Sequence, residues 1–218
     1  MLLFNMGSSV ITDVRLGSTQ AKAVYIGSTL VWPVSSKWTF TDDFERTAIG
    51  TTDWTSSGVV IAGTAPKRYL QKDSYNGTSS AWTVKTFSGD QLEVECLLGT
   101  WNDSQQLCSV NIGNPNGAYA YVEFSRSVLR IGYTSGTGDW NIVATPSVIS
   151  WANGDTITFK RVGTVFSLYR NGTYIASGTC PALSSVTANR VGFSLRRASN
   201  VFGAYYGPTI DIVKVSSR

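Results

Sequence analysis

Residues 155–178 read DTITFKRVGTVFSLYRNGTYIASG, which is three runs of alternating apolar and polar residues separated by turn residues. The pair Asn171-Gly172 strongly favours a type I′ turn, so we expect residues 164–170 and 173–178 to form an antiparallel hairpin. Gly163 is expected to turn the chain into the first of these two strands. Three successive strands joined by tight turns form a meander, which indicates an antiparallel β domain.

Short runs of the same kind recur along most of the chain. Trp38 to Phe44 alternate large apolar with polar residues, as in a strand with one buried face. The other expected strands span residues 58–62, 67–71, 80–87, 91–98, 105–112, 118–125, 128–133, 140–144, 156–162, 190–197 and 209–215. This spacing, with 12% aromatic and only 15% charged residues, predicts an all-β sandwich with little helix.

Residues 14–33 contain a short repeat. Leu16 to Thr19 and Ile26 to Thr29 share one pattern, an apolar residue followed by Gly-Ser-Thr, which predicts two small β hairpins. Isolated hairpins bury little apolar surface, so we expect this segment to pack against the rest of the chain or a neighbouring subunit. The residues expected to make this docking or assembly contact are Leu16, Gly17, Ile26, Gly27, Leu30, Val31 and Trp32.

The chain is therefore expected to have three parts: a β-hairpin docking module at residues 1–33, a polar linker at 34–37 and a β sandwich at 38–218. The apolar run at the start of the chain is too short for a secretory signal and lacks the positive charge of one. The sequence also has no run of 18 apolar residues. We expect a protein that is neither exported by the general route nor inserted in a membrane.

Two resemblances follow from these residues. The repeat at 14–33, which ends in Val-Trp-Pro, resembles the N-terminal segments of minor tail proteins from phages of actinobacteria. Residues 38–218, with the meander, an Asp-Asp-Phe-Glu-Arg opening at 42–46 and a closing strand at 209–215, resemble the concanavalin A-like jelly roll. That fold is shared by lectins, laminin G-type modules and glycan-active enzymes, so it does not decide the function.

Catalysis is not expected. A glycosidase needs two carboxylates, and Glu93 and Glu95 lie on one face of a predicted strand. The Glu-x-Asp-x-x-Glu signature of laminarinase-like enzymes, however, would place Leu98 at its final glutamate, so we expect both acids to face solvent while Leu92, Val94 and Cys96 face the core. The chain has no histidine, which removes histidine-dependent triads and zinc sites.

Other site classes are also weakly supported. Cys96, Cys108 and Cys180 are expected to be buried thiols, although a hairpin turn at 99–103 would place Cys96 opposite Cys108 and permit a disulfide. No cofactor is expected. Oxygen ligands for Ca²⁺ are available at Asp42, Asp43, Asn102 and Asp103, but solvated turns are the preferred interpretation. The net charge of +4 is too dispersed to predict nucleic-acid binding.

Saccharide binding is the interpretation that the residues favour most. Aromatic rings beside amides and carboxylates in predicted loops suit a sugar, which has apolar C–H faces and polar hydroxyls. The candidates are Trp101, Asn102, Asp103, Tyr133, Asp139, Trp140, Asn141 and Trp151. The same rings could instead belong to the core or a subunit interface. The arginines at 126, 130, 190, 196 and 197 could contact acidic glycans or lie on exposed strand faces.

Together, the resemblances imply a phage virion protein without enzymatic activity. A minor tail protein that displays its jelly roll to a host cell-wall glycan is expected first. A capsid decoration protein of the same construction, and a free lectin or glycoside hydrolase, are the alternatives. The expected partners are other phage structural proteins and a host glycan, without nucleic acid or membrane, in a particle assembled in the host cytoplasm. A homo-oligomer, with a trimer favoured, is expected because virion appendages follow the symmetry of their mounts.

Overall fold

A computed structural model of the chain describes residues 15–16, 19–20, 24–26, 29–32, 38–73, 76–100, 106–125, 128–136, 138–147, 151–201 and 203–217. The chain divides into two compact units, residues 1–37 and 38–218. In the first unit β1 (Arg15–Leu16) pairs with β2 (Thr19–Gln20), and β3 (Val24–Ile26) pairs with β4 (Thr29–Trp32). Both hairpins predicted from the repeat are therefore present.

The assembly role of this unit stays a prediction. Gly17 and Gly27 lie outside the described residues, and so do the side chains of the other expected docking residues, Leu16, Ile26, Leu30, Val31 and Trp32.

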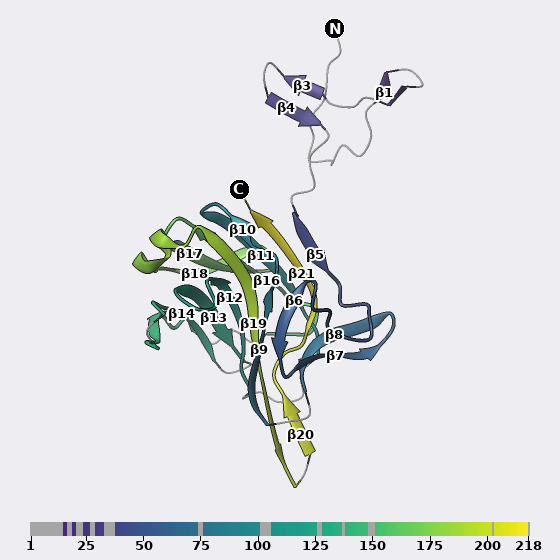
Figure 1. The fold of residues 1–218 in the computed structure, drawn as a ribbon, viewed down its shortest axis with the longest axis vertical. Coiled ribbons are helices and arrows are strands. Elements are labelled where there is room, and N and C mark those ends of the chain that lie inside the picture. Colours follow the sequence, from purple (N-terminus) through teal and green to yellow (C-terminus); the bar gives the residue numbers. More distant parts are fainter. Residues whose placement is uncertain are drawn as a thin grey trace. The chain divides into compact units, whose positions relative to one another are not determined.

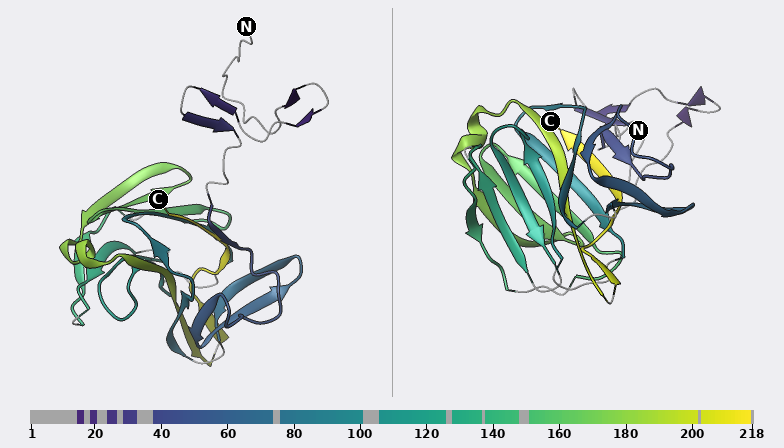
Figure 2. Two further views of the ribbon diagram at one scale, coloured as in Figure 1. Left: turned by 45° about the horizontal axis from the view of Figure 1, so that its top comes forward. Right: turned by 60° about the horizontal axis from the view of Figure 1, so that its bottom comes forward.

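The second unit is a sandwich of two antiparallel sheets (Figures 1 and 2). The nine-stranded sheet has the order β15-β14-β13-β12-β19-β9-β6, with β10 and β20 also paired to β19. Its strands are β6 (Trp54–Ser57), β9 (Gly77–Thr83), β10 (Phe87–Ser88), β12 (Cys108–Gly113), β13 (Tyr119–Phe124), β14 (Leu129–Thr134), β15 (Asn141–Ala144), β19 (Ala188–Asn200) and β20 (Gly203–Tyr206).

The eight-stranded sheet has the order β18-β17-β16-β11-β21-β8-β7, with β5 also paired to β21. Its strands are β5 (Phe40–Asp42), β7 (Val59–Thr64), β8 (Lys67–Lys72), β11 (Gln91–Leu98), β16 (Thr156–Val162), β17 (Val165–Arg170), β18 (Thr173–Thr179) and β21 (Ile210–Ser217). One 3₁₀ helix, η1 (Pro181–Ser185), follows β18. In Figure 1 the β7–β8 hairpin and the β19–β20 hairpin project from the sandwich.

The predicted meander is confirmed. Strands β16, β17 and β18 pair in sequence, and Arg170 faces Thr173 across a two-residue turn. Asn171 and Gly172 both have positive φ, 49° and 79°, as a type I′ turn requires. The closing strand β21 pairs with β5, so the last strand returns beside the first as expected.

The core lies between the sheets and is built by alternate residues of each strand. On β11, Leu92, Val94 and Cys96 are buried at 0–2% exposure. Glu93 and Glu95 occupy the outer face, where they form ion pairs with Lys160 (3.6 Å) and Lys214 (3.0 Å). The expectation that these two acids face solvent is confirmed.

All three cysteines are free and buried. The alternative of a Cys96–Cys108 cross-strand bridge is wrong, because β11 and β12 are not neighbours. Strand β11 pairs with β16 and β21, whereas β12 pairs with β13 and β19 of the other sheet. Burial raises the pKa of each thiol, so all three stay protonated near neutral pH.

The strand expected at residues 38–44 is shorter in the structure, because Asp42 ends it. The Asp42 carboxylate accepts hydrogen bonds from Phe44 N (2.8 Å), from the two terminal guanidinium nitrogens of Arg46 (2.6 and 2.7 Å) and from Trp54 Nε1 (2.7 Å). Phe44 then takes a positive φ of 56°. These donors occupy both oxygens of Asp42, so it does not offer the Ca²⁺ ligand that was considered.

A candidate saccharide-binding face

The outer face of the nine-stranded sheet carries the aromatic residues of interest. On β13, Ala120, Val122 and Phe124 enter the core, so Tyr119 and Tyr121 point to the outer face. The cross-strand register places Tyr121 in one row with Asn111 on β12, Gly192 on β19 and Trp82 on β9. Residues far apart in the sequence therefore form one continuous surface.

Four of these rings touch one another and form what we call the aromatic platform: Trp82, Tyr119, Tyr121 and Trp140. Ring centroids lie 5.3 Å apart for Trp82 and Tyr119, 6.2 Å for Tyr119 and Trp140, and 5.1 Å for Tyr121 and Trp140, all edge to face. Tyr121 is buried, Trp82 and Tyr119 are half-buried, and Trp140 is 64% exposed. The platform thus offers a large open indole above a fixed base of rings.

Two glycines make room for the platform. A Cβ on Gly192 would overlap the indole of Trp82, and a Cβ on Gly132 would overlap the phenol of Tyr121. Glycine inside a strand often marks a close approach of another group, here a ring from the neighbouring strand. The rings are consequently held in place by backbone beneath them.

Polar groups lie in the same rows as the rings. Asn111 is 2% exposed, accepts a hydrogen bond from Ser109 Oγ (3.1 Å) and donates one to Ser194 Oγ (3.3 Å). Burial raises the pKa of Tyr119 and of Tyr121, so both phenols remain neutral and able to donate hydrogen bonds well above neutral pH. Phenols and serine hydroxyls are suitable partners for sugar hydroxyls.

The turn that carries Trp140 is held by Asp139. Its carboxylate accepts hydrogen bonds from Ser135 N (3.0 Å), from the hydroxyls of Ser135 and Thr134, and from Asn141 Nδ2 (2.8 Å). Asp139 and Asn141, both predicted to contact the ligand, therefore hold the turn together. Their effect on a ligand would come through the position of Trp140.

Acidic groups are scarce on this face. Among the described residues, Glu123 is the only carboxylate in the strands of the nine-stranded sheet, and it pairs with Arg130 at 3.2 Å. Hydrolysis of a glycosidic bond needs two carboxyl groups about 5–10 Å apart. The strands described here do not supply such a pair.

The structure brings together only part of the predicted site. Trp140 lies on the platform, but Tyr133 points from β14 to the opposite, core-facing side. Trp151 is 2% exposed and packs against Phe124, with ring centroids 5.6 Å apart, so its expected role at the surface is wrong. Trp101, Asn102 and Asp103 lie outside the described residues.

Three platform residues, Trp82, Tyr119 and Tyr121, were not among the sequence candidates. They lie within strands, whereas the sequence candidates lie in or beside predicted loops. The available signal was glycine inside the partner strands, at Gly132 and Gly192.

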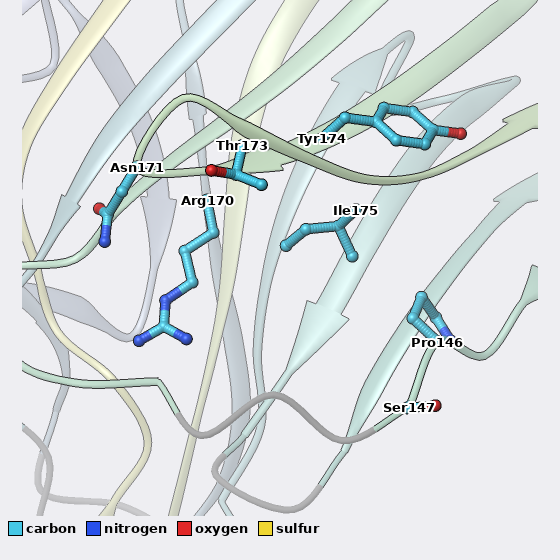
Figure 3. A pocket seen from close by; sticks show the side chains of 7 residues that line it. All are labelled: Pro146, Ser147, Arg170, Asn171, Thr173, Tyr174 and Ile175. Atoms are coloured by element: carbon cyan, nitrogen blue, oxygen red, sulfur yellow. The ribbon is translucent and has the colours of Figure 1, made fainter.

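A hollow of about 720 Å³ lies elsewhere, beside the β17–β18 hairpin. In Figure 3 the side chains of Arg170 and Ile175 extend from this hairpin, and Pro146 and Ser147 line the hollow from a separate segment. The Arg170 guanidinium is already neutralised by Asp155 at 2.7 Å. This hollow has no ring cluster comparable with the platform, so it is not the candidate site.

Two further site classes can be judged on the described residues. These residues contain no group of three or more Cys, Asp or Glu side chains placed to hold a metal ion. Their single helix, η1, is far too short to cross a membrane.

The chain matches no family model and no curated protein sequence. Solved structures nevertheless share its fold. A Bacillus licheniformis β-glucanase is similar with a TM-score of 0.58 at 14% identity, over 82% of this chain and 98% of that chain. The Emp47p carbohydrate recognition domain is similar with a TM-score of 0.59 at 12% identity, over 84% and 96%.

The carbohydrate-binding module CBM66 from Bacillus subtilis is similar with a TM-score of 0.53 at 11% identity, over 76% of this chain and 96% of that chain. At these identities the likeness establishes the fold alone. The chain therefore has the concanavalin A-like jelly-roll sandwich, the all-β fold that its sequence predicted.

Proposed function

We propose that residues 38–218 form a carbohydrate-binding domain that holds a saccharide on the aromatic platform. The observation that carries this proposal is the 64% exposure of Trp140, an indole held in place by two tyrosines yet open to water. A sugar ring can stack its C–H face on such a ring while its hydroxyls bind nearby phenols. The likeness to a carbohydrate recognition domain and a glucanase supports the proposal.

Binding without hydrolysis is the form of this function that the platform favours. A glycosidase needs two carboxylates, but the described strands of this sheet have only Glu123, and this residue forms an ion pair with Arg130. We therefore propose a lectin-like role. A reducing-sugar assay with any polysaccharide that the protein binds should give no product above background, and steady release of product would contradict this part of the proposal.

The test of binding is electrophoresis of the full chain through gels that contain actinobacterial cell-wall arabinogalactan. Trp140→Ala should abolish the retardation. Tyr174→Ala is the matched control, because Tyr174 is a similarly exposed ring, at 55%, on β18 of the other sheet. Equal retardation of wild type and both variants would contradict the platform as the site.

We further propose that the protein is a virion component, with a minor tail protein preferred over a capsid decoration protein. Only the resemblance of residues 14–33 supports this placement. Gold-labelled antibodies against the chain should decorate tails in electron micrographs of phage particles. Decoration of heads would favour the capsid alternative, and the absence of any label would contradict both.

Homo-oligomerisation through residues 1–33 belongs to the same proposal. All the core residues found in the structure lie between Phe44 and Val215, so a chain that starts at Lys37 should fold. Light scattering should give a trimer for the full chain and a monomer for the shorter one. Monomers in both cases would contradict the assembly role.

A further inference from the structure

The two sheets differ in how many of their cations form ion pairs. On the eight-stranded sheet, ion pairs neutralise Lys72 with Asp73, Lys160 with Glu93, Lys214 with Glu95 and Arg170 with Asp155. On the described strands of the nine-stranded sheet all the cations are arginines, at positions 130, 190, 196 and 197, against the single acid Glu123. The strands of both sheets have the same excess of three positive charges, because the eight-stranded sheet has seven cations and four carboxylates, so the sheets differ in ion pairing and not in net charge.

Two of these arginines lie on the outer face of β19 together with the platform. Val191, Phe193 and Leu195 are buried in the core, so Arg190, Gly192, Ser194 and Arg196 alternate on the outer side. Gly192 lies under the Trp82 indole. Trp82 thus sits between Arg190 and Arg196, which are about 20 Å apart along the strand.

Arg190 is positioned beside the rings. Its guanidinium donates hydrogen bonds to Thr83 O and to Thr55 Oγ (3.0 Å), and Thr55 faces Trp82 across the β6–β9 pair. These two bonds use Nε and one terminal nitrogen, which leaves the other terminal nitrogen able to donate. A fixed guanidinium beside an aromatic ring is well suited to a carboxylate or phosphate.

Arg196 is exposed, and no described carboxylate pairs with it. A cation left unpaired at the surface is common by itself. Here it is the second unpaired arginine on the same strand face as the platform, at the other side of Trp82. Together they would place positive charge on either side of Trp82 along β19, at one side of the row of rings that runs across the sheet to Trp140.

We propose that the ligand of the platform is an acidic saccharide, in which carboxylate or phosphate groups bind Arg190 and Arg196 while sugar rings stack on Trp140 and Trp82. This inference rests on the proposed carbohydrate-binding function and specifies its ligand class. Arginine suits such groups because its guanidinium is always charged and donates directional hydrogen bonds to anionic oxygens.

The test compares polygalacturonate with its fully methyl-esterified form, in which a neutral methyl ester replaces each carboxylate, by calorimetry with the full chain. Wild type should bind the acidic polymer at least about tenfold more tightly, as expected for charge-assisted hydrogen bonds. The double substitution Arg190→Gln with Arg196→Gln should remove this difference and keep the binding of the ester. The single variant Arg196→Gln is measured as well. Arg196 is exposed, so this variant tests the role of an arginine even if the substitution of Arg190 disturbs folding.

The matched control removes two cations from the opposite face, by Lys160→Gln with Lys214→Gln, and should keep the preference for the acidic polymer. A phosphodiester-linked teichoic acid, used in a parallel arm, distinguishes phosphate from carboxylate as the anion. Preference for either anionic polymer, lost only in the arginine variants, supports the inference.

The contrary outcomes are distinct. Equal affinity of wild type for the acidic polymer and its ester, with no preference for teichoic acid, overturns the acidic ligand and leaves the saccharide platform intact. Loss of preference in the lysine control would show that net charge alone is responsible and also overturns it. Acidic binding that survives Trp140→Ala unchanged would overturn the platform itself.

Discussion

The indole of Trp82 on β9 lies over Gly192 on the adjacent strand β19, in space that any larger residue at position 192 would fill. Beyond β19, the Trp82 ring contacts Tyr119 on β13, which is two strands from β19 in the sheet, and the two ring centroids are 5.3 Å apart. The platform therefore depends on glycine at position 192 as well as on the four aromatic residues.

Gly192→Ala should displace the Trp82 ring without removing any aromatic residue. We expect a loss of about 1–3 kcal/mol in the free energy of unfolding, as for other overpacked sites, and weaker saccharide binding. Urea denaturation followed by tryptophan fluorescence measures the first effect. Gly50→Ala is the matched control, since a Cβ there meets no atom within 4 Å. Identical stabilities of the two variants would contradict the role of Gly192.

Asp42 should make the fold sensitive to acid. Burial by itself would raise its pKa, but hydrogen bonds from Arg46, Trp54 and Phe44 N lower the pKa overall. A pKa that is lower in the folded state stabilises the fold fully above the unfolded value of about 3.9, and this stabilisation is lost as pH falls through the folded value. The free energy of unfolding should therefore fall below about pH 4.

Asp42→Asn tests this dependence. It should lower the free energy of unfolding by about 1–3 kcal/mol at pH 7, because Arg46 and Trp54 lose a charged acceptor. The free energy of unfolding should also fall less steeply toward low pH than in the wild type. It should still fall somewhat, because the pKa of Asp155 is lowered as well. Asp43→Asn, one residue away and exposed, is the control. The prediction fails if the two variants show the same acid denaturation curve.

Arg161 is a buried cation, 1% exposed, that reaches from β16 to η1 and β19. Its guanidinium donates hydrogen bonds to Asn189 Oδ1, Leu183 O (2.6 Å) and Val186 O (3.1 Å). Arg161→Met would keep most of the volume and leave these acceptors without a donor. We expect a loss of about 2–4 kcal/mol in urea denaturation.

Arg196→Met is the matched control for Arg161→Met, because Arg196 is exposed. Its stability should stay within about 0.5 kcal/mol of the wild type. A similarly small effect for Arg161→Met would show that the buried hydrogen bonds add nothing to stability.

The three thiols should be unreactive in the folded protein. Cys96, Cys108 and Cys180 are at most 1% exposed, and burial raises the pKa of each. The thiolate is the reactive form, so the folded chain should not react with a disulfide reagent at pH 8. In denaturant without reductant, three thiols per chain should react. A count of one after unfolding would reveal a disulfide and contradict the free cysteines.

The sequence predicted the sandwich well because its turns have residues with special backbone requirements. Asn171 and Gly172 adopt the positive φ values that their pairing favours, and this fixes the register of β17 and β18. Strand β20 was missed, and so was β6 at Trp54, a short strand at the end of the sheet order. Short edge strands carry too few residues for alternation to be recognised.

The site was harder to predict than the fold. In the run Tyr119-Ala120-Tyr121-Val122 both faces are apolar, so alternation alone does not say which face enters the core. In the structure Ala120 and Val122 enter the core, and the two tyrosines lie on the outer face, where both contact Trp140. Trp151 shows the converse error, since a tryptophan beside a predicted loop turned out to be a core residue.

Strand β19 lies between β12 and β9, and it follows every ring of the platform in the chain. A ribosome releases the N-terminal part first, so a nascent chain that already contains Trp140 still lacks the strand that joins the two halves of the sheet. The platform can therefore assemble only after β19 has been synthesised. A product that stops before β19 would carry all four rings without the sheet that arranges them as a platform.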